Sequence, residues 1–163
     1  MKVGKSIRFC SEVDEAGNLH LVLLSKNDNN EEASTVAIFS LHTGKTKIIG
    51  SNIGEKGSIV EYASSEYIIT KSQKRIDVWK MKDSPKEPVK TFIHNHRIVS
   101  ARMQENQGTI AFSDSKGKIL FWSFAGEDSN RVVSQCHWHA SAVADFLISS
   151  NGTSFGFGTW SNE

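Results

Sequence analysis

The chain has 163 residues, of which 23% are charged and 38% hydrophobic, and its formal net charge is +1. These values are ordinary for a globular protein, and the absence of an apolar run of about 18 residues excludes a membrane span. The length allows one domain with its own core, and the N-terminal residues lack the apolar stretch of a signal peptide. The two cysteines, Cys10 and Cys136, are too few and too far apart for a disulfide framework, so we expect reduced thiols in an intracellular protein.

Short β-rich runs follow one another along the chain, separated by Gly, Asn, Asp and Ser, and capped stretches of helical periodicity are missing. In chain order, the expected strands are residues 5–10, 20–25, 34–41 and 45–49, then 58–63, 66–71, 75–81 and 88–93, then 97–103, 108–113, 118–124 and 131–137, and finally 142–149 and 153–158. The sequence therefore predicts an all-β protein.

Two residue types recur along the chain with one period. Phe39, Trp79 and Trp122 end similar apolar runs at steps of 40 and 43 residues, and His96 and His139 are also 43 residues apart. A period of about 40–45 residues is typical of a four-stranded propeller blade. We therefore expect a partial β-propeller of about three and a half four-stranded antiparallel blades.

The expected blades divide the chain into residues 1–50, 51–93, 94–137 and an incomplete 138–163, which together form a single partial propeller over 1–163. Closed propellers usually have about four to eight blades. A fragment of a larger propeller is the preferred explanation, and a tighter closure or a dimer is the alternative.

The string HNHRIVSARMQENQGTIAFSDSKGKILFW resembles a WD repeat, and HASAVADFLISSNGTSFGFG resembles the first half of the next one. The chain departs from the WD pattern at several positions. Gln73 and Lys116 stand where the turn aspartate is usual, Phe39 replaces the first tryptophan, and no Trp-Asp pair is present.

The WD resemblance implies a hydrogen-bond network of Asp, His, Ser and Trp inside each blade. In the third blade, the resemblance assigns His96, Ser113 and Trp122 to this network, with Asp114 as a substitute for the missing aspartate. The full set of structural blade residues that it implies is His96, Ser113, Asp114, Trp79, Trp122 and His139.

Candidate metal and catalytic groups are weak in this sequence. His137 and His139 share a strand face, but zinc takes three or four ligands and Cys136 points to the opposite face. His139, Asp145 and Ser149 lie close together without a nucleophile-elbow motif. Asn151-Gly152 indicates a hairpin turn, and the Gly156-Phe157-Gly158 run lacks a following helix that would make a phosphate site. We predict no catalytic, metal or cofactor site, no small-molecule substrate and no disulfide between Cys10 and Cys136.

Basic residues concentrate in one part of the chain. Residues 71–118 have a net charge of +6, whereas 1–70 and 119–163 have −2 and −3. Such a surface binds phosphates through charge alone, and the alternative is an ordinary solvated loop surface. The candidate RNA or partner contacts are Lys71, Lys74, Arg75, Lys80, Lys82, Lys86 and Lys90.

The HWH string at 137–139, together with TIAFSDSKGKILFWSF and EYIITKSQKRIDVWK, resembles the nucleolar WD-repeat subunits of the small-subunit processome. This resemblance implies a scaffold in the transcription-coupled U3 subcomplex, which links RNA polymerase I transcription to 18S pre-rRNA processing. The implied partners are other processome proteins and pre-rRNA or U3 small nucleolar RNA, without a membrane, and the implied location is the nucleolus. The alternative is a general WD-repeat adaptor in the cytoplasm.

Overall fold

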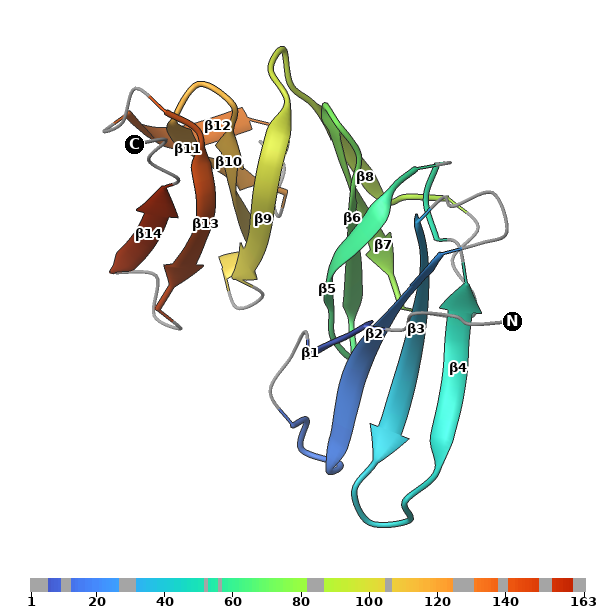
Figure 1. The fold of residues 1–163 in the computed structure, drawn as a ribbon. Coiled ribbons are helices and arrows are strands. Elements are labelled where there is room, and N and C mark those ends of the chain that lie inside the picture. Colours follow the sequence, from blue (N-terminus) through green and yellow to red (C-terminus); the bar gives the residue numbers. More distant parts are fainter. Residues whose placement is uncertain are drawn as a thin grey trace. The chain divides into compact units, whose positions relative to one another are not determined.

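The computed structural model describes residues 6–9, 13–26, 32–51, 53–55, 57–81, 87–104, 107–124, 131–137, 141–149 and 154–159. The regular structure of these residues consists of 14 β-strands without an α-helix (Figure 1), which confirms the predicted all-β class. Among them, no helix has the length and apolar character needed to cross a membrane.

The first two sheets each contain four strands that neighbour one another in chain order (Figure 1). The first sheet is formed by β1 (Ser6–Phe9), β2 (Asn18–Lys26), β3 (Glu32–Ser40) and β4 (Thr46–Ser51). The second sheet is formed by β5 (Ile59–Ala63), β6 (Tyr67–Lys71), β7 (Arg75–Lys80) and β8 (Lys90–Ile93).

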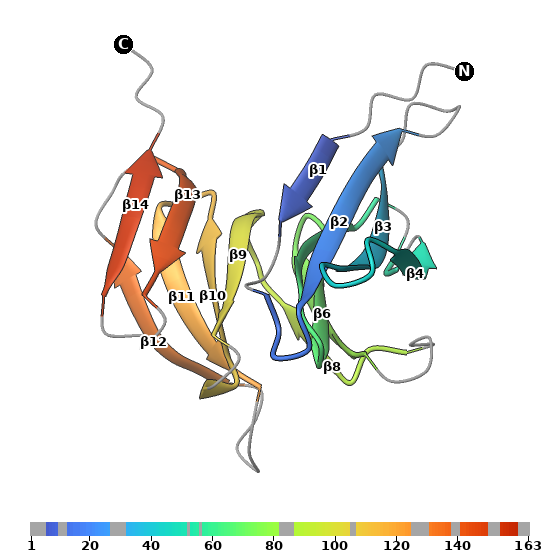
Figure 2. The same cartoon turned by 90° about the horizontal axis from the view of Figure 1, so that it is seen from below.

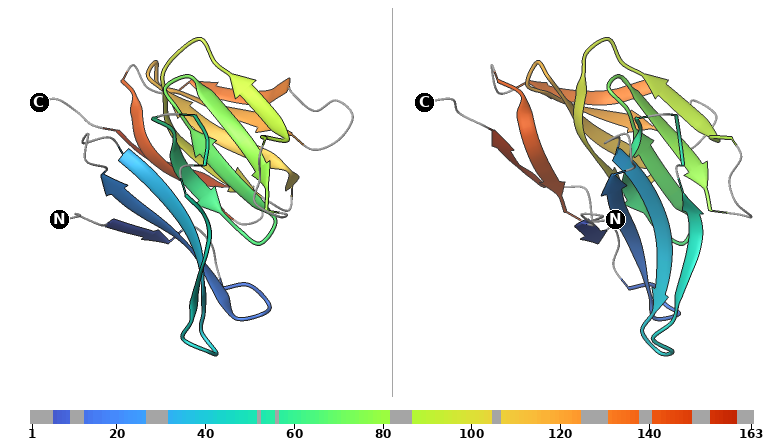
Figure 3. Two further views of the ribbon diagram at one scale, coloured as in Figure 1. Left: turned by 90° about the vertical axis from the view of Figure 1, so that its right-hand side faces the viewer. Right: turned by 45° about the vertical axis from the view of Figure 1, so that its right-hand side comes forward.

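The third sheet also has four strands, and the fourth has two (Figure 2). The third sheet is formed by β9 (Ile98–Gln104), β10 (Thr109–Asp114), β11 (Lys118–Ser123) and β12 (Arg131–His137). In the fourth sheet, β13 (Val143–Ile148) pairs antiparallel with β14 (Phe155–Thr159) (Figure 3). Three four-stranded antiparallel sheets and a half sheet confirm the predicted blade composition.

Strand ends differ from the sequence-based expectation in the first sheet. Leu41 was expected to end a strand, but it lies in the turn between β3 and β4. The amide of Gly44 donates to the carbonyl of Ser40 at 2.9 Å, and Gly44 has φ of 65°, a conformation that favours glycine. The turn that contains this glycine therefore ends β3 at Ser40, one residue before the apolar run ends at Leu41.

The chain divides into two compact units, Met1–Ser72 with Ile76–Thr91, and Gln73–Arg75 with Phe92–Glu163. Each unit has its own core where one sheet packs on the next. The single-domain boundaries expected from the sequence stay a prediction.

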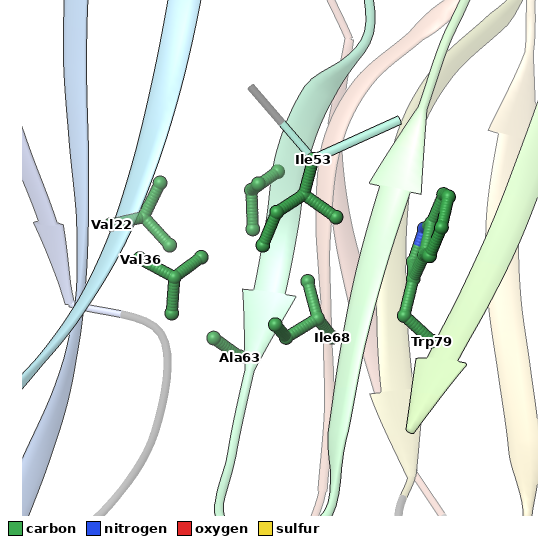
Figure 4. Packing of buried hydrophobic residues seen from close by; sticks show 7 residues of the cluster. Val22, Val36, Ile53, Ala63, Ile68 and Trp79 are labelled. Carbon is green, nitrogen blue, oxygen red and sulfur yellow. The ribbon is translucent and has the colours of Figure 1, made fainter. Parts of the chain in front are cut away.

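In the first unit, Val22 and Val36 of the first sheet belong to one buried cluster with residues of the second sheet (Figure 4). The members contributed around the second sheet are Ile53, Val60, Ala63, Ile68 and Trp79. Alternate residues of a strand face the same side, so the branched side chains of β2 and β3 form one apolar face.

In the second unit, Ala111 and Ile119 of the third sheet are buried with Val143 and Phe146 of the fourth sheet. Phe146 is only 2% exposed. The same arrangement therefore occurs in both units, with the middle strands of one sheet covered by the first strands of the next.

Candidate functional site

Lys71, the first of the predicted RNA contacts, is buried at the end of β6. The residue is 9% exposed, and its ammonium nitrogen lies 3.6 Å from Oε1 of Glu61 on β5. An ammonium group that is buried and paired is not available to a phosphate at the surface. Lys71 therefore does not contribute to an exposed basic surface, which corrects the interpretation of its charge from the sequence.

The other described basic candidates are spread along β7, the turn before it and the start of β8. Arg75 begins β7 and Lys80 ends it, so their backbones are about 16 Å apart at the strand rise of about 3.3 Å per residue. Lys74 and Lys80 are exposed, whereas Arg75 and Lys90 are half-buried. Lys82 and Lys86 lie outside the described residues.

Asp114 is fully buried at the end of β10 and organises the turn that follows it. Its Oδ1 accepts hydrogen bonds from the amides of Lys116 at 2.9 Å and Lys118 at 3.0 Å. Its Oδ2 lies 3.0 Å from Nε2 of His94. Burial by itself raises the pKa of Asp114, but the hydrogen bonds from His94, Lys118 and Lys116 outweigh this effect and hold the pKa below its ordinary value.

The histidine that contacts Asp114 is not the one expected from the repeat. His94 occupies this position, and the ring of His96 lies against the ring of His94 with an edge-to-face geometry at 5.6 Å. The structure thus places His94, and not the predicted network histidine His96, beside Asp114. The two histidines are separated by one residue, and their spacing in the sequence does not distinguish which ring reaches the carboxylate.

Trp122 does not take part in the expected hydrogen-bond network. The side chain is fully buried, and its Nε1 has no hydrogen-bond partner among the described residues. Its ring packs instead against Phe92 at 5.2 Å and Phe124 at 6.2 Å. The expected set of His96, Ser113 and Trp122 is thus not linked by hydrogen bonds in this blade.

The second sheet contains the tryptophan hydrogen bond that Trp122 does not make in the third sheet. Trp79 Nε1 donates to Oγ1 of Thr70 at 2.9 Å, and both residues are buried. Trp79 pairs with Ile68, and Trp122 pairs with Ile110, so Phe112 has the position in β10 that Thr70 has in β6. Phe112 offers no acceptor, which explains the unpaired indole nitrogen of Trp122.

Ser113 is buried, and it links the third sheet to the fourth. Its Oγ donates to the carbonyl of Val143 at 3.1 Å.

Residue 139 lies outside the described part of the chain, so the predicted structural role of His139 stays a prediction.

Two of the metal and catalytic candidates, His137 and Ser149, contact backbone carbonyl groups of nearby turns. His137 Nε2 lies 3.1 Å from the carbonyl of Lys116, and Cys136 is a half-buried free thiol. No group of three metal-ligating side chains occurs within the described ranges. Ser149 Oγ donates to the carbonyl of Ser154 at 3.0 Å, and Gly156 and Gly158 lie inside β14.

Polar side chains of β9 form a set of contacts with β13 that the sequence analysis missed. Asp145 Oδ1 accepts from Arg102 Nη2 at 2.5 Å and from Ser100 Oγ at 3.1 Å. Gln104 Nε2 donates to the carbonyl of Ser149 at 3.2 Å. Ser100, Arg102 and Gln104 alternate along β9, and this polar period of two was the available signal.

Comparisons with known proteins support the fold. No protein-family model matches the chain, and no curated protein sequence matches it. A solved structure titled as the crystal structure of the mitotic checkpoint complex matches 96% of this chain, with a TM-score of 0.61 and 12% sequence identity. The match covers 46% of the other chain, so this chain spans about half the length of that neighbour. At this identity the likeness shows the fold alone, that of a β-propeller, and it does not extend to the processome family.

Proposed function

We propose that this chain acts as a non-enzymatic scaffold that binds other proteins. The WD-repeat propeller fold carries this proposal, because stacked sheets with buried apolar faces hold the exposed turns in fixed positions. One solved structure that it resembles is titled as a complex, the mitotic checkpoint complex, which is consistent with protein partners.

The finer proposal is a role in nucleolar ribosome biogenesis. Its support is the sequence resemblance around the HWH string at 137–139 and the excess of basic residues between 71 and 118. In the structure, Lys74 and Lys80 provide exposed ammonium groups from the second sheet. The proposed partners are other processome proteins and pre-rRNA or U3 small nucleolar RNA.

A binding measurement with RNA tests the nucleolar role. Fluorescence anisotropy with a labelled pre-rRNA leader is expected to show saturable binding that weakens as salt rises, because phosphate contacts release counterions. Replacing both exposed lysines (Lys74→Glu and Lys80→Glu) is expected to weaken the binding about tenfold at low salt. The double charge reversal Lys45→Glu and Lys47→Glu, at two exposed lysines outside the stretch 71–118, is the matched control.

The alternative function is a general WD-repeat adaptor in the cytoplasm. Salt-independent or absent RNA binding, together with cytoplasmic location of the tagged chain in cells and recovery of protein partners only, would favour this alternative over the nucleolar role. The scaffold proposal itself survives that outcome and is contradicted when crosslinking in cells recovers no protein partner.

A further inference from the structure

The turn between β3 and β4 exposes a set of side chains that the proposed function does not use. All residues from Leu41 to Ile48 are exposed, including two large apolar side chains, Leu41 at 50% and Ile48 at 65%. The stretch 33–54 contains Lys45 and Lys47 and no acidic residue. This exposed surface, Leu41–Ile48, is called the β3–β4 hairpin surface below.

Backbone hydrogen bonds hold the hairpin surface, one within the hairpin and one to the turn before β2. The amide of Ser40 donates to the carbonyl of Lys45 at 2.9 Å, and the amide of Leu41 donates to the carbonyl of Gly17 at 3.0 Å. Gly17 has φ of 73°, and a Cβ at this position would lie 2.5 Å from Nε2 of His42. The turn before β2 therefore lies directly against the hairpin and fixes its position.

β4 is the last strand of its sheet (Figures 1 and 3). The sheet order ends at β4, which pairs with β3 on one side only among the described residues. An edge strand presents backbone N–H and C=O groups that pair with an added strand. Lysines on an edge discourage pairing between identical strands, but an exposed isoleucine on the same strand favours contact with an apolar partner.

We propose that the free edge of β4 binds an extended acidic peptide by antiparallel strand addition. The charge of Lys45 and Lys47 favours acidic residues in the peptide, and Ile48 favours an apolar one. A surface for nucleic acid needs the lysines alone, whereas this one combines them with two exposed apolar side chains and an unpaired strand edge. The observations therefore favour a peptide over RNA.

The register of an antiparallel strand defines the peptide pattern. Residues directly opposite on neighbouring strands interact most strongly. From its N-terminus, the peptide places an apolar residue opposite Ile48, an acidic one opposite Lys47, a residue of high strand propensity opposite Thr46 and a second acidic one opposite Lys45. The expected pattern is thus apolar, acidic, β-branched, acidic.

A labelled peptide of sequence Ser-Val-Ile-Glu-Thr-Glu-Thr tests the proposal by fluorescence anisotropy with the full chain. Saturable binding is expected, with slower amide hydrogen exchange across residues 46–51. The double replacement of Lys45→Glu and Lys47→Glu is expected to weaken binding about tenfold, because two favourable cross-strand pairs become repulsive. The variant Lys116→Glu reverses one exposed charge in the turn between β10 and β11 and is expected to bind like the wild type.

Two further probes separate strand addition from other causes. The same peptide with N-methylated amides keeps its side chains but loses its donors, and its binding is expected to disappear. Equal binding of this peptide, no saturable binding of the original, or tighter binding of polyuridylate that displaces the peptide would each overturn the proposal. Because the Lys45 and Lys47 replacements leave Lys74 and Lys80 intact, the result is independent of the RNA measurement.

Discussion

The two indole nitrogens at equivalent strand positions show how one neighbouring side chain determines a hydrogen bond. Trp79 donates to Thr70, and Trp122 has Phe112 at the corresponding place and finds no acceptor among the described residues. A buried donor without a partner costs roughly 1–3 kcal/mol. The aromatic contacts of Trp122 with Phe92 and Phe124 offset part of this cost.

Asp114 provides the clearest prediction at the residue scale. The replacement Asp114→Asn is expected to lower the free energy of unfolding by about 2 kcal/mol near neutral pH, because it weakens charge-assisted bonds to His94 and to the turn amides. The folded state lowers the pKa of Asp114, so its stabilisation is present above the unfolded pKa of about 3.9 and is lost as pH falls through the lower folded pKa.

Urea denaturation of the wild type and the variant between neutral and acidic pH measures this effect. The difference between the two proteins is expected to be largest near neutrality and to shrink at acidic pH, below the unfolded pKa of the carboxyl group. Asp145→Asn serves as the control, since the Asp145 side chain is 63% exposed and its loss is expected to cost little. A difference that stays constant across the whole pH range contradicts the role assigned to the charge.

At the scale of the element, two glycines with positive φ test what positions the β3–β4 hairpin. Gly17 has φ of 73° and faces His42, whereas Gly44 has φ of 65° and open space around it. Gly44→Ala is expected to cost about 1 kcal/mol from backbone strain alone. Gly17→Ala is expected to cost slightly more, because the new methyl group also displaces the exposed imidazole of His42, which has room to move.

Thermal unfolding of both alanine variants, alone and combined with His42→Ala, measures the contribution of backbone strain and that of the contact with the imidazole. Removing the imidazole is expected to bring the cost of Gly17→Ala close to that of Gly44→Ala. Equal costs in the presence of His42 would show that the turn before β2 does not depend on this contact.

At the scale of the whole molecule, stability comes from sheets that pack against each other inside each compact unit. Two adjacent residues of β13 allow a core position to be compared with a surface position. Phe146 is 2% exposed, whereas Leu147 is 71% exposed. Phe146→Ala is expected to lower the free energy of unfolding by about 3–5 kcal/mol, because it leaves a cavity against Ala111 and Ile119. Leu147→Ala is expected to change it by less than about 0.5 kcal/mol.

Chemical denaturation with fluorescence and circular dichroism recorded together checks this pair of variants. Similar costs at the two positions would mean that the third and fourth sheets do not share the core described here.

The sequence by itself determined the fold class and the repeat, because both depend on local patterns. Alternation of apolar residues predicts strands, and aromatic residues at steps of 40 and 43 predict successive four-stranded sheets. The fourteen strands of the described residues follow this pattern closely, with differences of up to two residues at the strand ends.

Only the tertiary structure decided which side chains meet. It paired Asp114 with His94 instead of His96, buried Lys71 beside Glu61 and joined Arg102 to Asp145. These contacts depend on the register between strands and on the packing of one sheet on another, and residue spacing along the chain does not specify either. Charge in a sequence therefore indicates where basic residues lie along the chain, whereas burial decides which of them a partner can reach.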